Sequence, residues 1–160
     1  MPDMLVKLYD LPDAAPALEA CAAQGVQIRR AMTPDKAAVT AWAAQNLGPG
    51  AGGEADVCFA RFPVSCFLAT RGRQIVGFAC YNATAPDFFG PTAVAESERG
   101  SGVGKALLLR SLQALRDEGY AYAIIGGVGP AEFYAKCAGA VLIEGSSPGI
   151  YRDYLGGMND

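Results

Sequence analysis

Three alternating glycines, Gly100, Gly102 and Gly104, constrain the fold of this chain more than any other feature. They follow a strand-like segment that ends at Ala95 and precede an amphipathic segment that ends at Glu118. The sequence therefore predicts a strand, a glycine-rich turn and a helix in that order. Glycine has no Cβ, so a ligand can approach the backbone, and the first turn of a helix presents free N–H groups and a positive dipole. This pattern favours a binding site for an anion such as phosphate.

Two common phosphate-binding motifs do not fit this segment. A nucleotide P-loop requires glycine where Arg99 stands and a hydroxyl where Ala106 stands. The dinucleotide fingerprint requires glycine at Lys105 in one register and a small residue at Leu107 in the other. A turn that binds no ligand is the plain alternative, but such a turn does not need three alternating glycines before a helix.

Composition excludes several classes of protein. The 160 residues fit a single domain, and 51% hydrophobic residues provide enough apolar surface for a core, which excludes a disordered chain. A net charge of -3 argues against a protein that neutralises nucleic-acid phosphates. The chain has no histidine, so His-dependent triads are excluded, and we expect no metal cofactor.

The cysteines are odd in number, form no C-x-x-C pair and stand mostly in apolar runs, which predicts buried free thiols. A cysteine nucleophile is the alternative, with Cys80 and Cys137 as its carriers, but it lacks a histidine partner. The five positions are Cys21, Cys58, Cys66, Cys80 and Cys137.

The N-terminus carries Asp3, Lys7 and Asp10, so it does not resemble a signal peptide. No segment approaches the roughly 18 apolar residues that a membrane span requires. We therefore expect a cytoplasmic protein that associates with neither membrane nor nucleic acid. The high apolar content and low charge favour a homodimer.

The other elements follow from periodicity and turn residues. Gly48 to Gly53 reads as a mobile loop, because it carries no side chain that can build a core. Strands joined first by hairpins and later by helices predict an α/β or α+β fold with a mixed sheet. The predicted strands are 4–9, 26–30, 66–70, 74–82, 88–95, 120–125, 141–144 and a last strand in the tail through Tyr154. The predicted helices run from Asp10 or Asp13 to 24, and over 33–47, 104–118 and 130–137.

The segment Arg99 to Gly104 has the pattern Arg-x-x-Gly-x-Gly, with Val94 five residues before the arginine and Lys-Ala-Leu-Leu after it. It resembles the coenzyme A signature of the GNAT superfamily of N-acetyltransferases. The resemblance extends over residues 26–155 and implies a mixed, mostly antiparallel sheet with a splayed central strand pair and flanking helices. We accordingly divide the chain into a strand–helix extension, residues 1–24, packed on a GNAT N-acetyltransferase domain, residues 25–160.

The resemblance implies that acetyl-CoA is the co-substrate and that the glycine segment holds its pyrophosphate. Arg99, Lys105 and Arg110 would add positive charge, and the strand over 88–95 would carry a bulge and pair with the pantetheine arm. Glu96 stands where many relatives have proline. The implied cofactor-binding residues are Val94, Ala95, Glu96, Arg99, Gly100, Ser101, Gly102, Val103, Gly104 and Lys105.

The segment from Glu132 to Lys136 resembles the family's Phe-Tyr-x-Lys helix and implies that Tyr134 is the general acid. A phenol with a pKa of about 10 is suited to protonate a thiolate leaving group. In the family a glycine usually follows four residues after the tyrosine, whereas Gly139 follows after five, so the helix end is expected to shift. A tyrosine that only packs under the sheet is the alternative.

Three carboxylates are candidates for the base that takes the proton of the acceptor amine: Glu54, Asp56 and Asp87. Each could bind a cationic substrate instead. The loop from Gly126 to Pro130 either lines the acceptor pocket or makes a tight turn. Four other side chains are either pocket walls or core, and Arg152 is equally ambiguous. The four are Tyr81, Phe88, Phe89 and Tyr151.

The resemblance therefore implies an N-acetyltransferase in which a primary amine of a small molecule or peptide attacks the acetyl thioester directly. A catalytically silent acyl-CoA sensor that keeps the glycine segment is one alternative. A nucleotide-binding domain is the other, although the P-loop pattern is broken. The acceptor stays open, because specificity lies in loops that vary on one scaffold.

Overall fold

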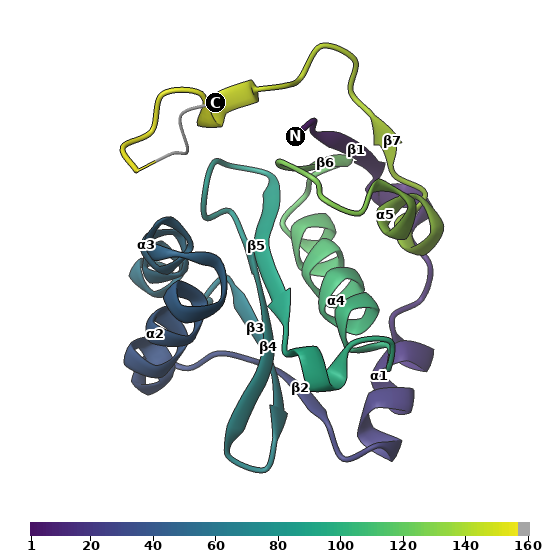
Figure 1. Cartoon of the computed structure of the whole chain (residues 1–160). Helices are drawn as coiled ribbons and strands as arrows, with labels where there is room; N and C mark the ends of the chain where they lie inside the picture. Colours follow the sequence, from purple (N-terminus) through teal and green to yellow (C-terminus); the bar gives the residue numbers. More distant parts are fainter. Residues whose placement is uncertain (157–160) are drawn as a thin grey trace.

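A computed structural model describes residues 1–156 as one seven-stranded sheet with helices on both faces (Figure 1). The strand order is β2-β3-β4-β5-β6-β1-β7, and every neighbouring pair is antiparallel except β5 and β6. The mixed, mostly antiparallel sheet predicted from the sequence is confirmed. The strands are β1 (Met4–Lys7), β2 (Gln27–Arg30), β3 (Cys66–Arg71), β4 (Gln74–Tyr81), β5 (Phe88–Val94), β6 (Tyr122–Ile125) and β7 (Val141–Leu142).

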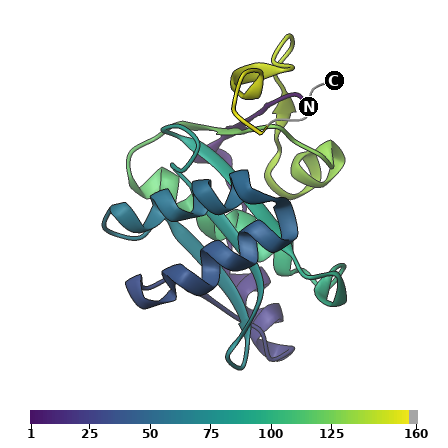
Figure 2. The same cartoon turned by 60° about the vertical axis from the view of Figure 1, so that its left-hand side comes forward.

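Helices α2 and α3 cover one face of the sheet, and α1, α4 and α5 lie on the other (Figures 1 and 2). Helix α4 lies along the sheet because its apolar stripe, which includes Leu108, Leu112 and Leu115, is fully buried. It ends before Gly119, whose φ of 105° suits the turn that follows. The helices are α1 (Ala15–Ala23), α2 (Lys36–Leu47), α3 (Pro49–Val57), α4 (Val103–Asp117) and α5 (Ala131–Ala138).

Two hydrophobic cores form, one on each face of the sheet, because successive side chains of a strand point to opposite faces. In β3, Phe67 and Ala69 join the core under α4, whereas Cys66 and Leu68 join the core under α2 and α3. The five cysteines are all free and buried, as predicted.

The N-terminal strand β1 lies inside the sheet rather than at its edge. Val6 is opposite Ala123 of β6, and Met4 is opposite both Ile125 of β6 and Leu142 of β7. Met4 and Val6 are buried in the core under α4. The first residues of the chain therefore join the C-terminal strand β7 to the rest of the sheet.

The prediction of a loop over residues 48–53 is wrong, because α3 begins at Pro49. A Cβ at Gly52 would lie 3.1 Å from the Cβ of Ala44 and 3.2 Å from the carbonyl oxygen of Thr40, both on α2. The glycine therefore allows two helices to pack at close range, and this tertiary contact outweighs its poor helix propensity.

The prediction of a last strand through Tyr154 is also wrong. The chain forms a short 3-10 turn, Gly149–Tyr151, beyond β7. Gly149 has a φ of 69°, and Pro148 precedes it, so the backbone turns here instead of extending. Figure 1 shows this yellow segment crossing near the start of β5.

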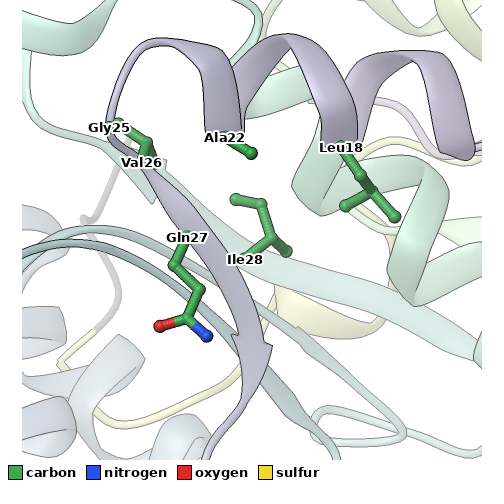
Figure 3. A pocket seen from close by; sticks show the side chains of 6 residues that line it. All are labelled: Leu18, Ala22, Gly25, Val26, Gln27 and Ile28. Carbon is green, nitrogen blue, oxygen red and sulfur yellow. The ribbon is translucent and has the colours of Figure 1, made fainter.

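Leu18 and Ala22 of α1 face Ile28 of β2 across an apolar groove of about 310 Å³ (Figure 3). Gln27 is its one polar lining side chain.

Within residues 1–156, the helices are all too short or too polar to traverse a bilayer.

Candidate active site

The glycine segment forms an open cradle at the start of α4. Gly100 and Gly102 have φ angles of 80° and 92°, and no atom lies within 4 Å of the position that a Cβ would take at either residue. The first hydrogen bond of the helix runs from the Ala106 amide to the Gly102 carbonyl at 3.1 Å, which leaves the amides of 103–105 without a helical acceptor. We call residues 100–104 the glycine cradle. Its free amides and positive dipole fit a diphosphate.

Helix α1 and the last residue of β3 hold the cradle in place. Gln24 Nε2 donates to the Ser101 carbonyl at 3.1 Å, and the Cys21 thiol donates to the Gly102 carbonyl at 3.8 Å. Arg71 donates to the Gln24 carbonyl at 2.7 Å and to the Glu98 carboxylate at 2.9 Å. The Arg71 guanidinium lowers the pKa of Glu98. Sequence reasoning missed these anchors, because contacts between distant segments leave no local pattern.

The sheet opens beside the cradle, where β5 separates from β6. These strands pair only at Phe88 with Ile124 and at Phe89 with Ile125, although β5 continues to Val94. The free part of β5 is the strand gap that the resemblance implied, and its presence is confirmed.

A bulge accompanies the strand gap. Tyr81 pairs with Phe89, but Ala79 pairs with Thr92, so β5 holds one extra residue near Gly90, whose φ is 119°. The Ala95 amide bonds the Val76 carbonyl at 2.8 Å on the β4 side, so alternation directs the backbone polar groups of Thr92 and Val94 into the gap. These groups are placed to pair with an extended ligand.

Tyr134 lies where the strand gap begins. Its ring packs edge-on against Phe89 of β5 at 6.3 Å and against Phe133 at 5.2 Å between centroids. A Cβ at Gly104 would lie 3.5 Å from the Phe133 ring, so α5 also lies beside the cradle. Burial raises the pKa of Tyr134, which keeps its hydroxyl protonated and able to donate. Gly139, with φ 66°, caps α5 and accounts for the five-residue spacing.

A carboxylate and two hydroxyls meet on the opposite face of β5. Thr84 Oγ1 donates to Glu54 Oε1 at 2.6 Å; the Tyr151 hydroxyl donates to Thr84 Oγ1 at 3.1 Å and lies 3.5 Å from Glu54 Oε1. A Cβ at Gly126 would lie 3.0 Å from the Phe88 ring and 3.4 Å from the Tyr151 hydroxyl. We call Glu54, Thr84 and Tyr151 the Glu54 cluster. It joins α3, the β4–β5 turn and the C-terminal turn beside the first residue of β5.

Residues 63–137, which span the strand gap, the glycine cradle and Tyr134, match a family model described as an acetyltransferase (GNAT) domain. This part of the chain therefore matches the GNAT acetyltransferase family. The match covers the cradle and the strand gap together, so the family and the local geometry rest on the same residues. No curated protein sequence matches the chain.

Solved structures show the same GNAT fold. They include the GCN5-related glucosamine N-acetyltransferase region of a fungal multi-domain β-N-acetylglucosaminidase (TM-score 0.70, 12% identity, 89% of this chain and 19% of that chain). A GCN5-related N-acetyltransferase from Sphaerobacter thermophilus has a TM-score of 0.65 at 20% identity, over 89% of this chain and 48% of that chain. A Drosophila protein has a TM-score of 0.62 at 16% identity, over 89% and 47%. This chain thus spans less than half of each of these proteins.

The three candidate bases occupy different environments. Glu54 belongs to the Glu54 cluster, whereas Asp56 is exposed and forms an ion pair with Lys36 at 3.4 Å. The Asp87 amide bonds Asn82 Oδ1 at 2.6 Å, and burial raises the pKa of Asp87 to about 6. Its Oδ1 atom is buried and has no hydrogen-bond partner among residues 1–156. Asp87 therefore gains a proton near neutral pH more readily than an exposed carboxylate does.

Of the charged residues predicted to lie at the cofactor site, three are beside the cradle and one is not. Arg99 Nε donates to the Val94 carbonyl at 3.4 Å, and Lys105 and Glu96 are exposed beside the cradle. Arg110 lies instead over the Phe67 ring, 4.6 Å from its centroid.

Burial and contacts place the four aromatic residues that were either pocket walls or core. Tyr81 and Phe89 are core residues, whereas Phe88 and Tyr151 lie at the Glu54 cluster. Burial raises the pKa of the Cys80 and Cys137 thiols, which disfavours the thiolate that a nucleophile requires. Thr84 was missed by sequence reasoning, since a threonine in a turn carries no functional signal.

Among residues 1–156, no group of three His, Cys, Asp or Glu side chains is arranged to hold a metal ion.

Proposed function

We propose that this GNAT domain transfers an acetyl group from acetyl-CoA to a primary amine by direct attack while both substrates are bound. The observation that carries the proposal is the open glycine cradle, which continues along the unpaired edge of β5 to Tyr134. Acetyl-CoA supplies a reactive thioester.

Backbone groups of this chain would bind the acetyl donor. The amides of the glycine cradle would hold the diphosphate, and Arg99 and Lys105 would add positive charge. The polar groups of Thr92 and Val94 would pair with the pantetheine arm, as in the addition of a strand to a sheet edge. Binding would therefore place the thioester near Phe89 and Tyr134.

Catalysis would consist mainly of positioning. The neutral amine nitrogen forms a bond to the acetyl carbon and gives up one proton to a carboxylate or water. The carbon–sulfur bond breaks, the sulfur takes the proton of the Tyr134 hydroxyl, and water returns a proton to Tyr134. Backbone N–H groups of the free β5 edge would stabilise the negative charge that develops on the carbonyl oxygen.

The acceptor must lose a proton before it attacks. An alkyl ammonium with a pKa of about 10.4 is neutral in only about one molecule in a few thousand at pH 7, so a carboxylate or water must draw the proton away. Glu54 contacts Thr84 of the β4–β5 turn and Asp87 lies directly before β5, whereas Asp56 lies at the surface of α3. The first two are therefore the better placed of the three candidates.

A thiol-release assay with acetyl-CoA and a panel of amines tests this function. We expect free thiol to appear only when protein and a suitable amine are both present. Saturable acetyl-CoA binding without amine-dependent thiol would instead identify a silent acyl-CoA sensor. A rise in melting temperature with ATP but not with coenzyme A would identify a nucleotide-binding domain.

Two further features stay predictions of the sequence. They are the cytoplasmic location and the assembly into a homodimer.

A further inference from the structure

The Glu54 cluster gives the acceptor side of the site a defined chemistry. Both hydroxyls of the cluster lie within reach of the same carboxylate oxygen, Oε1 of Glu54. The other oxygen, Oε2, makes no hydrogen bond to any residue of the described chain 1–156. Thr84 and Tyr151 thereby fix the direction of the carboxylate and leave one oxygen for a ligand.

The charge at this position is not neutralised by the protein. No Lys or Arg side chain forms an ion pair with Glu54 within residues 1–156. Burial first, and then the charges of Glu54 and Asp3, raise the pKa of Tyr151, so a second carboxylate also acts on this hydroxyl. Asp3 is itself almost fully buried and accepts a hydrogen bond from the Gly127 amide at 2.8 Å. A cation from outside the protein can therefore bind this carboxylate without displacing a side chain of the described residues.

The chemistry of the surroundings points to an organic cation. The described residues hold no three-ligand metal group, whereas Phe88 and Tyr151 both lie next to Gly126, and the Tyr151 hydroxyl lies 3.5 Å from Glu54 Oε1. Aromatic faces and a carboxylate together are suited to an alkyl ammonium, whose methylene groups contact the rings.

We propose that Glu54, oriented by Thr84 and Tyr151, selects acceptors that carry a second, charged amino group, so that the preferred acceptor class is a diamine. The proposal rests on the proposed acetyl transfer. The amine that attacks must be neutral, so a lasting positive charge at Glu54 must belong to another group of the same molecule. Tyr151 is a positioning residue here, and the C-terminal turn that carries it belongs to the acceptor site.

Three acceptors that share a five-carbon chain and differ only at the far end test the proposal: 1,5-diaminopentane, pentylamine and 6-aminohexanoate. We expect kcat/KM to fall in that order, with the diamine preferred over pentylamine by about tenfold, because a hydrogen-bonded charge contact contributes about that factor. In Glu54→Gln the ratio of kcat/KM for the diamine to kcat/KM for pentylamine should fall to about one. In Tyr151→Phe the KM for the diamine rises and kcat changes little.

Matched controls separate this effect from general changes of charge or ring. Asp153→Asn removes a carboxylate two residues from Tyr151, and Tyr154→Phe removes a hydroxyl from the same C-terminal segment. Both should keep the wild-type preference. The proposal is overturned if the wild-type protein acetylates diamine and pentylamine equally, or if Glu54→Gln keeps the preference.

Calorimetry with 1,5-diaminopentane in the presence of coenzyme A distinguishes this proposal from the proposed function. If no amine is acetylated, the proposed acetyl transfer fails. Saturable diamine binding that is lost in Glu54→Gln still supports the diamine site, and absence of binding overturns it.

Discussion

The glycine cradle presents main-chain amides from consecutive residues, whereas the Glu54 cluster presents side chains from three separate segments. In the cradle, Gly100 and Gly102 shape the backbone, and α1 holds it through Gln24. In the cluster, Glu54 and Tyr151 are 97 residues apart and meet only because α3 and the C-terminal turn converge on β5. A change of backbone geometry should therefore damage the cradle most, and a change of one side-chain atom should damage the cluster most.

The largest effect should come from Gly102→Val. A branched side chain is strained at a φ of 92°, and its Cβ enters the open space of the cradle. We expect the Kd for coenzyme A, measured by calorimetry, to rise by at least about 100-fold, from strain and lost amide contacts. Lys105→Ala should raise the Kd by less than about threefold, because an exposed charge contributes little.

Gly53→Ala serves as the control for that experiment. Gly53 lies in α3 without a positive φ and with open space around its Cβ position. Alanine should therefore preserve coenzyme A binding and raise the free energy of unfolding by about 0.5–1 kcal/mol in urea. Normal coenzyme A affinity in Gly102→Val would show that the cradle does not bind the diphosphate.

Tyr134→Phe extends the comparison to a single side chain that lies where the strand gap begins. Loss of the hydroxyl should lower kcat by about 100-fold, as for removal of a general acid, and leave the Kd for acetyl-CoA near its wild-type value. Tyr122→Phe, at an exposed tyrosine whose hydroxyl contacts Tyr9 at 3.3 Å, provides the control. Unchanged turnover in Tyr134→Phe would remove this residue from the mechanism.

Gln24→Ala tests whether a segment outside the glycine motif supports the cradle. The substitution removes the hydrogen bond to the Ser101 carbonyl, and we expect the Kd for coenzyme A to rise by about two- to tenfold. Gln27→Ala, at an exposed position of β2, should leave the affinity unchanged. An equal effect of both substitutions would mean that Gln24 does not position the cradle.

The smallest effect concerns Asp87, which lies directly before β5. Burial raises the pKa of Asp87 to about 6 in the folded protein, so the carboxyl binds a proton more tightly when folded, and wild-type stability falls as pH rises toward that value. Asp87→Asn removes this loss, and asparagine tolerates the φ of 67°. At about pH 8, urea titrations should give the variant a free energy of unfolding that exceeds the wild-type value by less than about 1 kcal/mol, because solvent screens this partly exposed group. At about pH 5 the difference between variant and wild type should be smaller. A stability gain of Asp87→Asn that is larger at about pH 5 than at about pH 8 would contradict the raised pKa of Asp87.

Particular elements show how far sequence patterns reach. The apolar stripe of α4 and the alternating glycines are local patterns, and the structure has the helix and the cradle where they predict them. The Gly48 to Gly53 segment has no such pattern, and it becomes helical because Gly52 packs against Ala44. The tail was expected to form a strand and instead delivers Tyr151 to Thr84.

The sequence by itself determined the order of strand, glycine cradle and helix, because the properties that create this unit belong to neighbouring residues: the absence of a Cβ, free amides and helical periodicity. Only the tertiary structure decided that β1 lies between β6 and β7, that Gln24 holds the cradle, and that Glu54, Thr84 and Tyr151 meet. The physical reason is that such contacts depend on how segments far apart in the sequence pack together. Packing of this kind produces no regular spacing of residues along the chain, so a local pattern cannot predict it.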